Sequence, residues 1–201
     1  TTHPYPVSYL DTLKLLESCG LKPPVAKIIN SESELSTLST LGYPLIAKTT
    51  NLEIKHKGKI GAIMVDLIGK SECLAAYTKL KQWGSSVVFQ EKIKSGHEVL
   101  LGAHHDSIWG WYIALGLGGS LSNTYDDRVY IFLPAEEDFI KSALARTKLS
   151  NLLTPNQTNM LVSSILKFQE LVLSVPKLTE LEINPLFITD SDLIAADLKR
   201  S

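Results

Sequence analysis

Two hydrophobic stretches near the end of the chain carry polar side chains that a buried strand would not need. They read LTELEINPLFI, Leu178–Ile188, and AADLKR, Ala195–Arg200. Glu182 and Asn184 lie two residues apart, so on a strand their side chains face the same side. Asp197 can come from a neighbouring strand across a short turn. The alternative is a pair of ordinary edge strands whose polar faces are in water.

The oxygen atoms of these side chains fit the chemistry of a magnesium ion bound to phosphate. Mg²⁺ is usually held by one or two protein carboxylate or carbonyl oxygens, and waters and substrate phosphates complete its coordination. Asn184 and Asp197 would form a partial site of this kind. Glu182 would share the ion or lie just behind it.

The rest of the chain mixes helical and strand-like patterns without strict β-α-β alternation. Consecutive predicted strands between residues 86 and 119 have no helix between them, which favours an antiparallel sheet. Apolar periodicity and the positions of glycine, proline and capping residues mark the other elements. The predicted helices are 8–20, 31–42, 71–84, 135–149 and 156–175, and the predicted strands are 25–29, 43–50, 62–68, 86–93, 97–106, 109–119, 128–134, 178–188 and 195–200.

This order of elements predicts an α+β fold with two lobes and a cleft. Residues 1–93 would form the N-terminal helix and the first lobe, and residues 94–201 the second lobe with its terminal hairpin. The 201 residues are enough for two small lobes that each have a hydrophobic core.

Composition and charge exclude several classes of protein. The net charge of −1 gives no indication of a nucleic-acid-binding surface. No apolar run reaches the ~18 residues of a membrane span, and no signal-peptide pattern is visible. Cys19 and Cys73 lack metal-site spacing, so we expect reduced thiols in a cytoplasmic protein. The first residue is not Met, which leaves open that the chain is part of a longer protein.

Lys48 and the following loop supply candidate phosphate ligands. A cation at the end of the apolar stretch 43–50 either pairs with an acid, binds a phosphate or reaches water from an edge strand. The stretch KHKGKIGA, Lys55–Ala62, combines basic side chains with glycines that let a backbone approach phosphate oxygens. Its spacing is not that of a Walker motif, and a solvated basic hairpin is the alternative.

The stretch VVFQEKI, Val87–Ile93, offers a possible binding edge for a purine. A strand that runs out between two lobes presents backbone N–H and C=O groups there, at Gln90 and Glu91. Glu98 begins the next predicted strand, where a carboxylate could bind both hydroxyls of a ribose. The alternative is exposed acids on either side of a turn.

Two further motifs say little by themselves. The glycines of LGLGGS, Leu115–Ser120, permit a tight turn. His104 and His105 suggest a metal site, but adjacent strand residues point to opposite faces, so they cannot easily share one ion. We interpret them as a polar strand end.

Taken together, these segments resemble the ATP-grasp domain of ADP-forming acyl-CoA synthetases of the acetate–CoA ligase type. That family is itself distantly related to the succinyl-CoA synthetase β subunit. The resemblance extends over nearly the whole chain and rests on motifs that occur in family order. They are LGYPLIAK, IKHKGKIGAI, VVFQEKIKSGHEVLLGAHHD, ALGLGGS and ELEINPLF.

The resemblance implies an ATP-grasp fold, in which two α+β lobes enclose a nucleotide cleft, and it implies ATP/ADP and Mg²⁺ as cofactors. Lys48 would bind the ATP phosphates, and Glu98 the ribose. Asn184 and Asp197 would hold Mg²⁺. The hinge residues that would meet adenine are Gln90, Glu91 and Ile93.

The family also implies a catalytic relay and a partner. His56 would carry phosphate on a mobile loop, and Glu182 would lie near the phosphoryl-transfer centre. The phosphate would pass to a phosphohistidine on a Rossmann-type CoA-binding domain or subunit, which would bind CoA and a small carboxylic acid. The implied reaction joins an acid and CoA with conversion of ATP to ADP and phosphate.

Some positions depart from the family pattern. Lys59 stands where an acid is usual, and Gly61-Ala62 where a Gly-Gly pair is usual. Asn123 replaces a Glu after the glycine turn, and an Arg expected on the next strand appears as Ile131. These departures favour as an alternative a degenerate ATP-grasp module with a regulatory role in a multidomain protein acetyltransferase. A third reading, an ATP-grasp ligase that joins an acid to an amine, gives no reason for His56.

Overall fold

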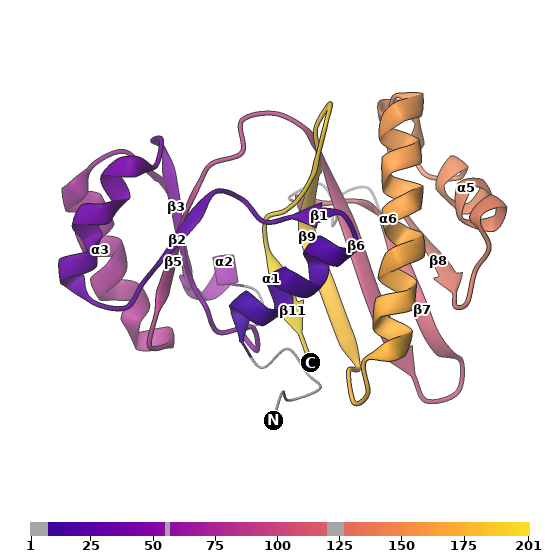
Figure 1. Cartoon of the computed structure of the whole chain (residues 1–201), viewed down its shortest axis with the longest axis horizontal. Helices are drawn as coiled ribbons and strands as arrows, with labels where there is room; N and C mark the ends of the chain where they lie inside the picture. The colour runs from indigo at the N-terminus through magenta and orange to yellow at the C-terminus, as the bar shows by residue number, and fades with distance from the viewer. Residues whose placement is uncertain (1–7, 55–56, 120–126) are drawn as a thin grey trace. The chain divides into compact units, whose positions relative to one another are not determined.

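The computed structural model describes residues 8–54, 57–119 and 127–201 (Figure 1). Contacts between Cα atoms divide the chain into two compact units. The smaller unit is the continuous segment Pro24–Lys94. The larger unit combines Thr1–Pro23 with Ser95–Ser201. The N-terminal helix, which the sequence analysis grouped with the first lobe, therefore lies in the larger unit.

The larger unit is built on a sheet in the order β1-β10-β9-β6-β7-β8, with β11 also paired to β9. The β6–β7 pair is antiparallel, as predicted, whereas the predicted strand 86–93 belongs to the sheet of the smaller unit. Among the strands described in the larger unit, only the β1–β10 pair is parallel. The strands are β1 (Leu21–Lys22), β6 (His97–Asp106), β7 (Gly110–Leu117), β8 (Arg128–Phe132), β9 (Glu180–Ile188), β10 (Leu193–Ala195) and β11 (Leu198–Arg200).

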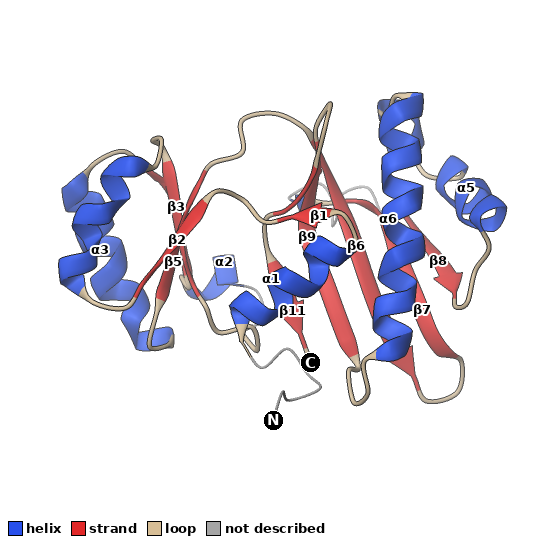
Figure 2. Ribbon diagram, in the orientation of Figure 1, coloured by secondary structure: helices blue, strands red, loops and turns tan. Residues whose placement is uncertain are grey.

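Helices cover one face of this sheet. They are α1 (Tyr9–Ser18), α5 (Glu137–Ala145) and α6 (Pro155–Ser174), and Figure 2 shows α1 and α6 lying across the strands. Thr154 begins α6 with a capping box, because its side chain accepts from the Gln157 N–H while the Gln157 side chain accepts from the Thr154 N–H. A short 3₁₀ helix, η4 (Leu149–Leu152), precedes it.

The core of the larger unit follows from strand alternation. Alternate residues of each central strand are fully buried, as expected for side chains that face a helical layer. The side chains that α5 and α6 contribute are buried at helical spacing. The buried set includes Leu101, Ala103, Ile113, Leu115, Ile131, Ile140, Leu144, Leu161, Ile165, Phe168, Leu181 and Ile183.

The smaller unit is an antiparallel sheet in the order β2-β5-β3-β4 with helices packed against it. Its core is a cluster of buried side chains that includes Ile29, Leu45, Leu80 and Phe89. The elements are β2 (Ala26–Ile29), η1 (Glu32–Thr40), β3 (Leu45–Thr49), α2 (Lys57–Ile60), β4 (Ile63–Leu67), α3 (Lys70–Leu80), η2 (Lys81–Trp83) and β5 (Val87–Glu91).

Two elements of the smaller unit differ from the sequence analysis. The predicted helix 31–42 is a 3₁₀ helix, η1. Its serine and threonine hydroxyls bond to the carbonyl oxygens three residues earlier, which competes with α-helical bonding. The donors are Ser36, Thr37, Ser39 and Thr40. Part of the loop predicted after Lys48 forms the short helix α2. Across the described chain, each helix is too short or too polar to cross a membrane.

Candidate functional site

The face of the larger sheet opposite the helices carries a row of polar side chains. On β9, Leu181 and Ile183 are buried in the core, whereas Glu180, Glu182 and Asn184 alternate with them and are half-buried. The sequence analysis predicted that Glu182 and Asn184 face the same side, and the alternation confirms it. We call this side of the sheet the polar face.

The glycine turn that follows β7 joins the polar face by hydrogen bonds. The Gly118 N–H donates to the Glu98 carbonyl oxygen at 2.8 Å, and the Gly119 N–H donates to the Asn184 Oδ1 at 2.8 Å. Gly119 has a φ of +60°, and a Cβ atom there would lie 1.4 Å from the Glu98 Oε2. The turn therefore needs glycine both for its backbone and for the space that the Glu98 carboxylate occupies.

Asp197 reaches the same place from the segment between β10 and β11. The Asn184 N–H donates to the Asp197 carbonyl oxygen at 3.1 Å, and the Asp197 side chain is half-buried. Burial and, to a smaller extent, the negative charge of Asp197 raise the pKa of the Tyr9 hydroxyl. Glu98, Asn184 and Asp197, which the sequence places far apart, are thus held together in one unit.

This donor set suits Mg²⁺. It consists of carboxylate and amide oxygens, which are the ligands that a small hard cation prefers. An amide oxygen has two lone pairs, so the bond from Gly119 leaves Asn184 Oδ1 able to accept a second partner. The residues present therefore fit the ion that the sequence analysis expected.

A second cluster on the polar face was not predicted. His104 on β6 stands directly opposite Glu180 on β9, and Glu182 is the next polar-face residue of β9. One ligand atom from each of the three side chains lies within 4.8 Å of the others. Lys199 on β11 forms an ion pair with the Glu180 Oε1. The cluster could not be predicted from the sequence because β6 and β9, which carry its side chains, are distant in the sequence.

Opposing effects shift the pKa values of His104 and Glu180 in this cluster. Burial lowers the pKa of the His104 imidazole, although the charges of Glu180 and Glu182 act in the opposite direction. Burial alone would raise the pKa of the Glu180 carboxyl, but hydrogen bonds from Lys199 and Ser201 and the Lys199 charge leave it lowered. The cluster thus combines a neutral His104 imidazole with an ionised Glu180 carboxylate at neutral pH.

His104 and His105 point to opposite faces of β6, as adjacent strand residues do. The ring of His104 stacks on Tyr112 with centroids 5.5 Å apart, whereas His105 packs edge-on against Trp111 at 5.3 Å. His104 is half-buried and His105 is exposed. The cluster contains only the first of the two, so the prediction that they do not share a site stands for the described residues.

Lys48 is a buried cation in the smaller unit. Lys48 is 1% exposed, and in the sheet its backbone lies opposite Ile63 of β4 and Val88 of β5. Since β3 lies between β5 and β4, the alternative of a lysine that reaches water from an edge strand is wrong. Burying an ammonium group is unfavourable unless it is paired, so this position points to a function or a defined partner.

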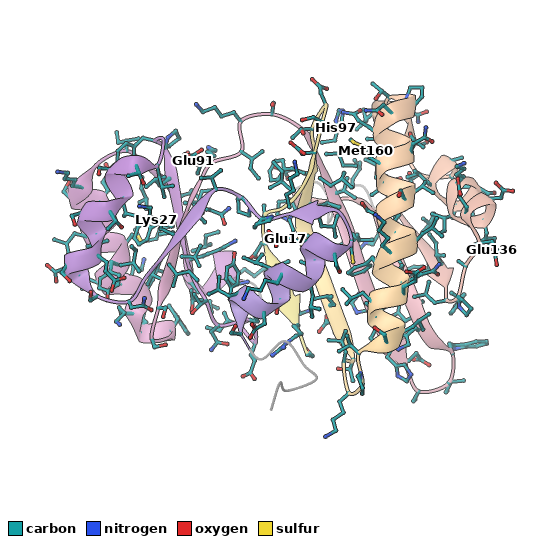
Figure 3. All side chains as sticks on the ribbon, in the orientation of Figure 1. Glu17, Lys27, Glu91, His97, Glu136 and Met160 are labelled. Carbon is teal, nitrogen blue, oxygen red and sulfur yellow. The ribbon has the colours of Figure 1, made fainter. Side chains whose placement is uncertain are left out.

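The predicted hinge residues differ in whether their polar groups already have hydrogen-bond partners in the protein. Gln90 is buried, and within the described ranges its Oε1 has no hydrogen-bond partner. Glu91, labelled in Figure 3, uses its carboxylate to accept from the Gly42 N–H at 2.8 Å, and its own N–H donates to the Val25 carbonyl oxygen at 2.9 Å. Ile93 is half-buried beyond the end of β5.

Other predicted positions are placed as follows. His56 and Asn123 lie outside the described residues. Lys59 is exposed in α2. Ile131, where the family pattern has an Arg, is fully buried on the core face of β8. Arg128, on the opposite face of the same strand, is exposed on the polar face.

Comparison with known proteins finds relatives among ADP-forming CoA ligases. The acetate–CoA ligase (ADP-forming) I β subunit of Pyrococcus furiosus is 25% identical over 204 residues, which cover 92% of this chain and 87% of that protein. The ADP-forming acetate–CoA ligase II of Archaeoglobus fulgidus is also 25% identical over 92% of this chain. The chain spans 28% of the length of the Archaeoglobus protein.

Solved structures share the fold. The crystal structure of PH1788 from Pyrococcus horikoshii has a TM-score of 0.80 at 22% identity, covering 95% of this chain and 88% of that chain. An acetyl-coenzyme A synthetase 1 of Ca. Korarchaeum cryptofilum, in complex with coenzyme A and Ca-AMPCP, has a TM-score of 0.79 at 19% identity, covering 93% and 89%. The family model of the ATP-grasp domain matches residues 7–200. The chain therefore belongs to the ATP-grasp domain family.

Proposed function

We propose that this chain is the nucleotide-binding part of an ADP-forming acid–CoA ligase. Acid, CoA and ATP would give acyl-CoA, ADP and phosphate, with a partner domain or subunit supplying the CoA site. Membership of the ATP-grasp family and the similarity to ADP-forming CoA ligases support the proposal.

The observation that carries the proposal is the assembly of Glu98, the Gly118-Gly119 turn, Asn184 and Asp197 on the polar face. A set of carboxylate and amide oxygens held on one face is what a metal ion bound to a nucleotide requires, and the N–H groups of the glycine turn hold two of the residues that supply it, Glu98 and Asn184. A structural role alone would not call for so many polar groups in adjacent strands.

Within this proposal each side chain has a defined task. Lys48 neutralises phosphate charge, Glu98 accepts hydrogen bonds from the ribose hydroxyls, and the carbonyl groups of Gln90–Ile93 receive the adenine edge. Asn184 and Asp197 hold Mg²⁺, which supplies charge neutralisation at the phosphates. Because phosphoryl transfer depends mainly on positioning and electrostatics, these contacts provide most of what the step needs.

His56 would be the nucleophile. Its imidazole nitrogen bonds to the γ-phosphorus while the bond from that phosphorus to the oxygen of ADP breaks, and ADP is released. Glu182 lies next to Asn184 on the polar face, where its carboxylate can orient the imidazole. The phosphate then passes to a histidine of a Rossmann-type CoA-binding partner, which binds the acid and CoA, and we expect this to occur in the cytoplasm.

The regulatory acetyltransferase module is not favoured. The relatives named above are CoA ligases. One of the departures that suggested a degenerate site, Ile131, is a buried core residue of β8.

The proposal is tested in two steps. Calorimetric titration with ATP and MgCl₂ should give saturable binding by the wild type, and none at millimolar ATP would contradict nucleotide binding. The chain is then incubated with γ-labelled ATP and the CoA-binding subunit of a related ligase. Label should appear on the wild type and be absent from His56→Asn, while His105→Asn should retain it. Equal labelling of wild type and His56→Asn would remove His56 from the relay.

A further inference from the structure

We propose that His104, Glu180 and Glu182 bind a divalent transition-metal ion, with Zn²⁺ as the best fit. The three ligand atoms lie within 4.8 Å of one another, and the His104 Nδ1 is 3.7 Å from the Glu180 Oε1. Two ligands about 2.1 Å from a tetrahedral zinc ion are about 3.4 Å apart. The pair is thus too far apart for a hydrogen bond but close to the spacing of two ligands on one ion.

The position of the His104 ring is fixed by two neighbours. Tyr112 stacks on it at an interplanar angle of 26°. The ring also lies close to Gly102, where a Cβ atom would be 2.9 Å from the His104 Nε2 and 3.4 Å from the Glu182 Cγ. Gly102 therefore leaves the space in which the imidazole and the Glu182 side chain approach each other. A metal ligand held in advance loses little conformational freedom on binding.

The accessibility of the cluster suits an exchangeable ion. The side chains of His104 and Glu180 are 25% and 14% exposed, so an ion can enter while water is largely excluded from the carboxylates. Lys199 pairs with Glu180 Oε1, and the Ser201 hydroxyl donates to Glu180 Oε2 at 2.8 Å. The Lys199 ammonium group thus supplies the positive charge that a metal ion would supply, and a divalent ion would have to displace it.

The donor types separate this site from the magnesium site. One imidazole nitrogen and two carboxylates favour Zn²⁺ or Co²⁺, whereas Mg²⁺ prefers oxygen ligands alone. Glu182 lies between the two sites, so a bound transition metal would bring positive charge close to Asn184. Glu182 belongs both to this site and to the proposed phosphoryl-transfer site, but none of the three ligands needs ATP to bind the ion.

The test is a titration of the metal-free full chain, without a polyhistidine tag, with Co²⁺ as a visible-absorption probe and then with Zn²⁺ by calorimetry. His104→Ala should weaken binding at least about tenfold, the size of effect that even outer-shell changes reach at metal sites. The matched control is His105→Ala, which alters the neighbouring histidine on the other strand face and should leave the affinity unchanged. Lys199→Gln removes the competing cation and should strengthen binding several-fold.

Several outcomes would overturn the inference. They are no saturable Co²⁺ binding by the wild type, equal affinities for wild type and His104→Ala, or loss of Co²⁺ binding in the double variant Asn184→Ala, Asp197→Ala. The last result would place the ion at the magnesium site and leave the proposed function intact. If His104→Ala does not fold, Lys199→Gln decides, since unchanged or weaker binding by that variant contradicts the site.

Discussion

The side-chain oxygen of Asn184 accepts a hydrogen bond of 2.8 Å from the backbone N–H of Gly119. This bond ties strand β9 to the glycine turn after β7, although β6 lies between the two strands in the sheet. The proposed metal ligand Asn184 and the glycine turn are therefore coupled, and changing either one should affect both binding and local stability.

Asn184→Ala removes both the acceptor and the metal ligand. We expect ATP affinity in the presence of Mg²⁺ to fall at least tenfold, and the free energy of unfolding to fall by about 1 kcal/mol for the lost hydrogen bond. Asn184→Asp keeps an oxygen in place and should lose less ATP affinity and less stability than Asn184→Ala. Calorimetry and urea unfolding measure the two effects, and an Ala variant with wild-type ATP affinity would contradict the metal assignment.

Gly119→Ala should impair nucleotide binding more than stability. The new Cβ atom would lie 1.4 Å from the Glu98 Oε2, so the carboxylate must move away. The matched control is Gly110→Ala, because Gly110 has a φ of +73° but nothing within 4 Å of its Cβ position. Both variants should lose about 1 kcal/mol of stability from backbone strain. Only Gly119→Ala should lower ATP affinity, and equal affinities would exclude Glu98 from the ribose site.

Lys48→Met tests the buried cation. Loss of a charge-assisted contact with phosphate, about 1.5–3 kcal/mol, corresponds to a decrease in ATP affinity of roughly 10- to 100-fold. Lys141→Met is the control, since this lysine is exposed on α5 and pairs with Glu137. Isothermal titration of both variants with ATP is the measurement. Unchanged affinity in Lys48→Met would mean that the lysine serves the structure of the smaller unit alone.

Glu180→Gln should reduce stability in a pH-dependent way. The pKa of Glu180 is lowered in the folded protein from its ordinary value of 4.5, so the folded state favours the ionised carboxylate. Its contribution is present above pH 4.5 and disappears as the pH falls through the lowered pKa. For a partly exposed pair we expect about 1 kcal/mol or less. Urea unfolding with EDTA should show a difference at neutral pH that shrinks in acid, and a difference that grows in acid would contradict the sign.

Much of the fold could be predicted from local patterns. The helices α3, α5 and α6 follow from apolar periodicity and from capping residues such as Thr154 and Gln157. The antiparallel β6–β7 pair follows from consecutive strands with a turn between them. The 3₁₀ form of η1 does not follow from apolar spacing, because it involves Ser and Thr hydroxyls that compete for the backbone carbonyls.

The candidate site was predictable where its residues share one motif. Glu182 and Asn184 lie on one strand, so alternation alone gave their common face. The contact of His104 with Glu180 depends on the register of β6 against β9, which is set by tertiary packing and not by neighbouring residues. The same limit explains Ile131, whose orientation could be assigned only once β8 had been placed beside β7.

The larger unit is interrupted by the smaller one. The chain leaves it after β1, completes every strand of the four-stranded sheet, and returns at β6. Because the inserted segment is continuous and has its own core, we expect it to fold when it is produced alone, whereas the larger unit must bring together two chain segments that are distant in the sequence. Insertions and deletions in such a protein should be tolerated best at the two junctions, near Pro24 and Lys94.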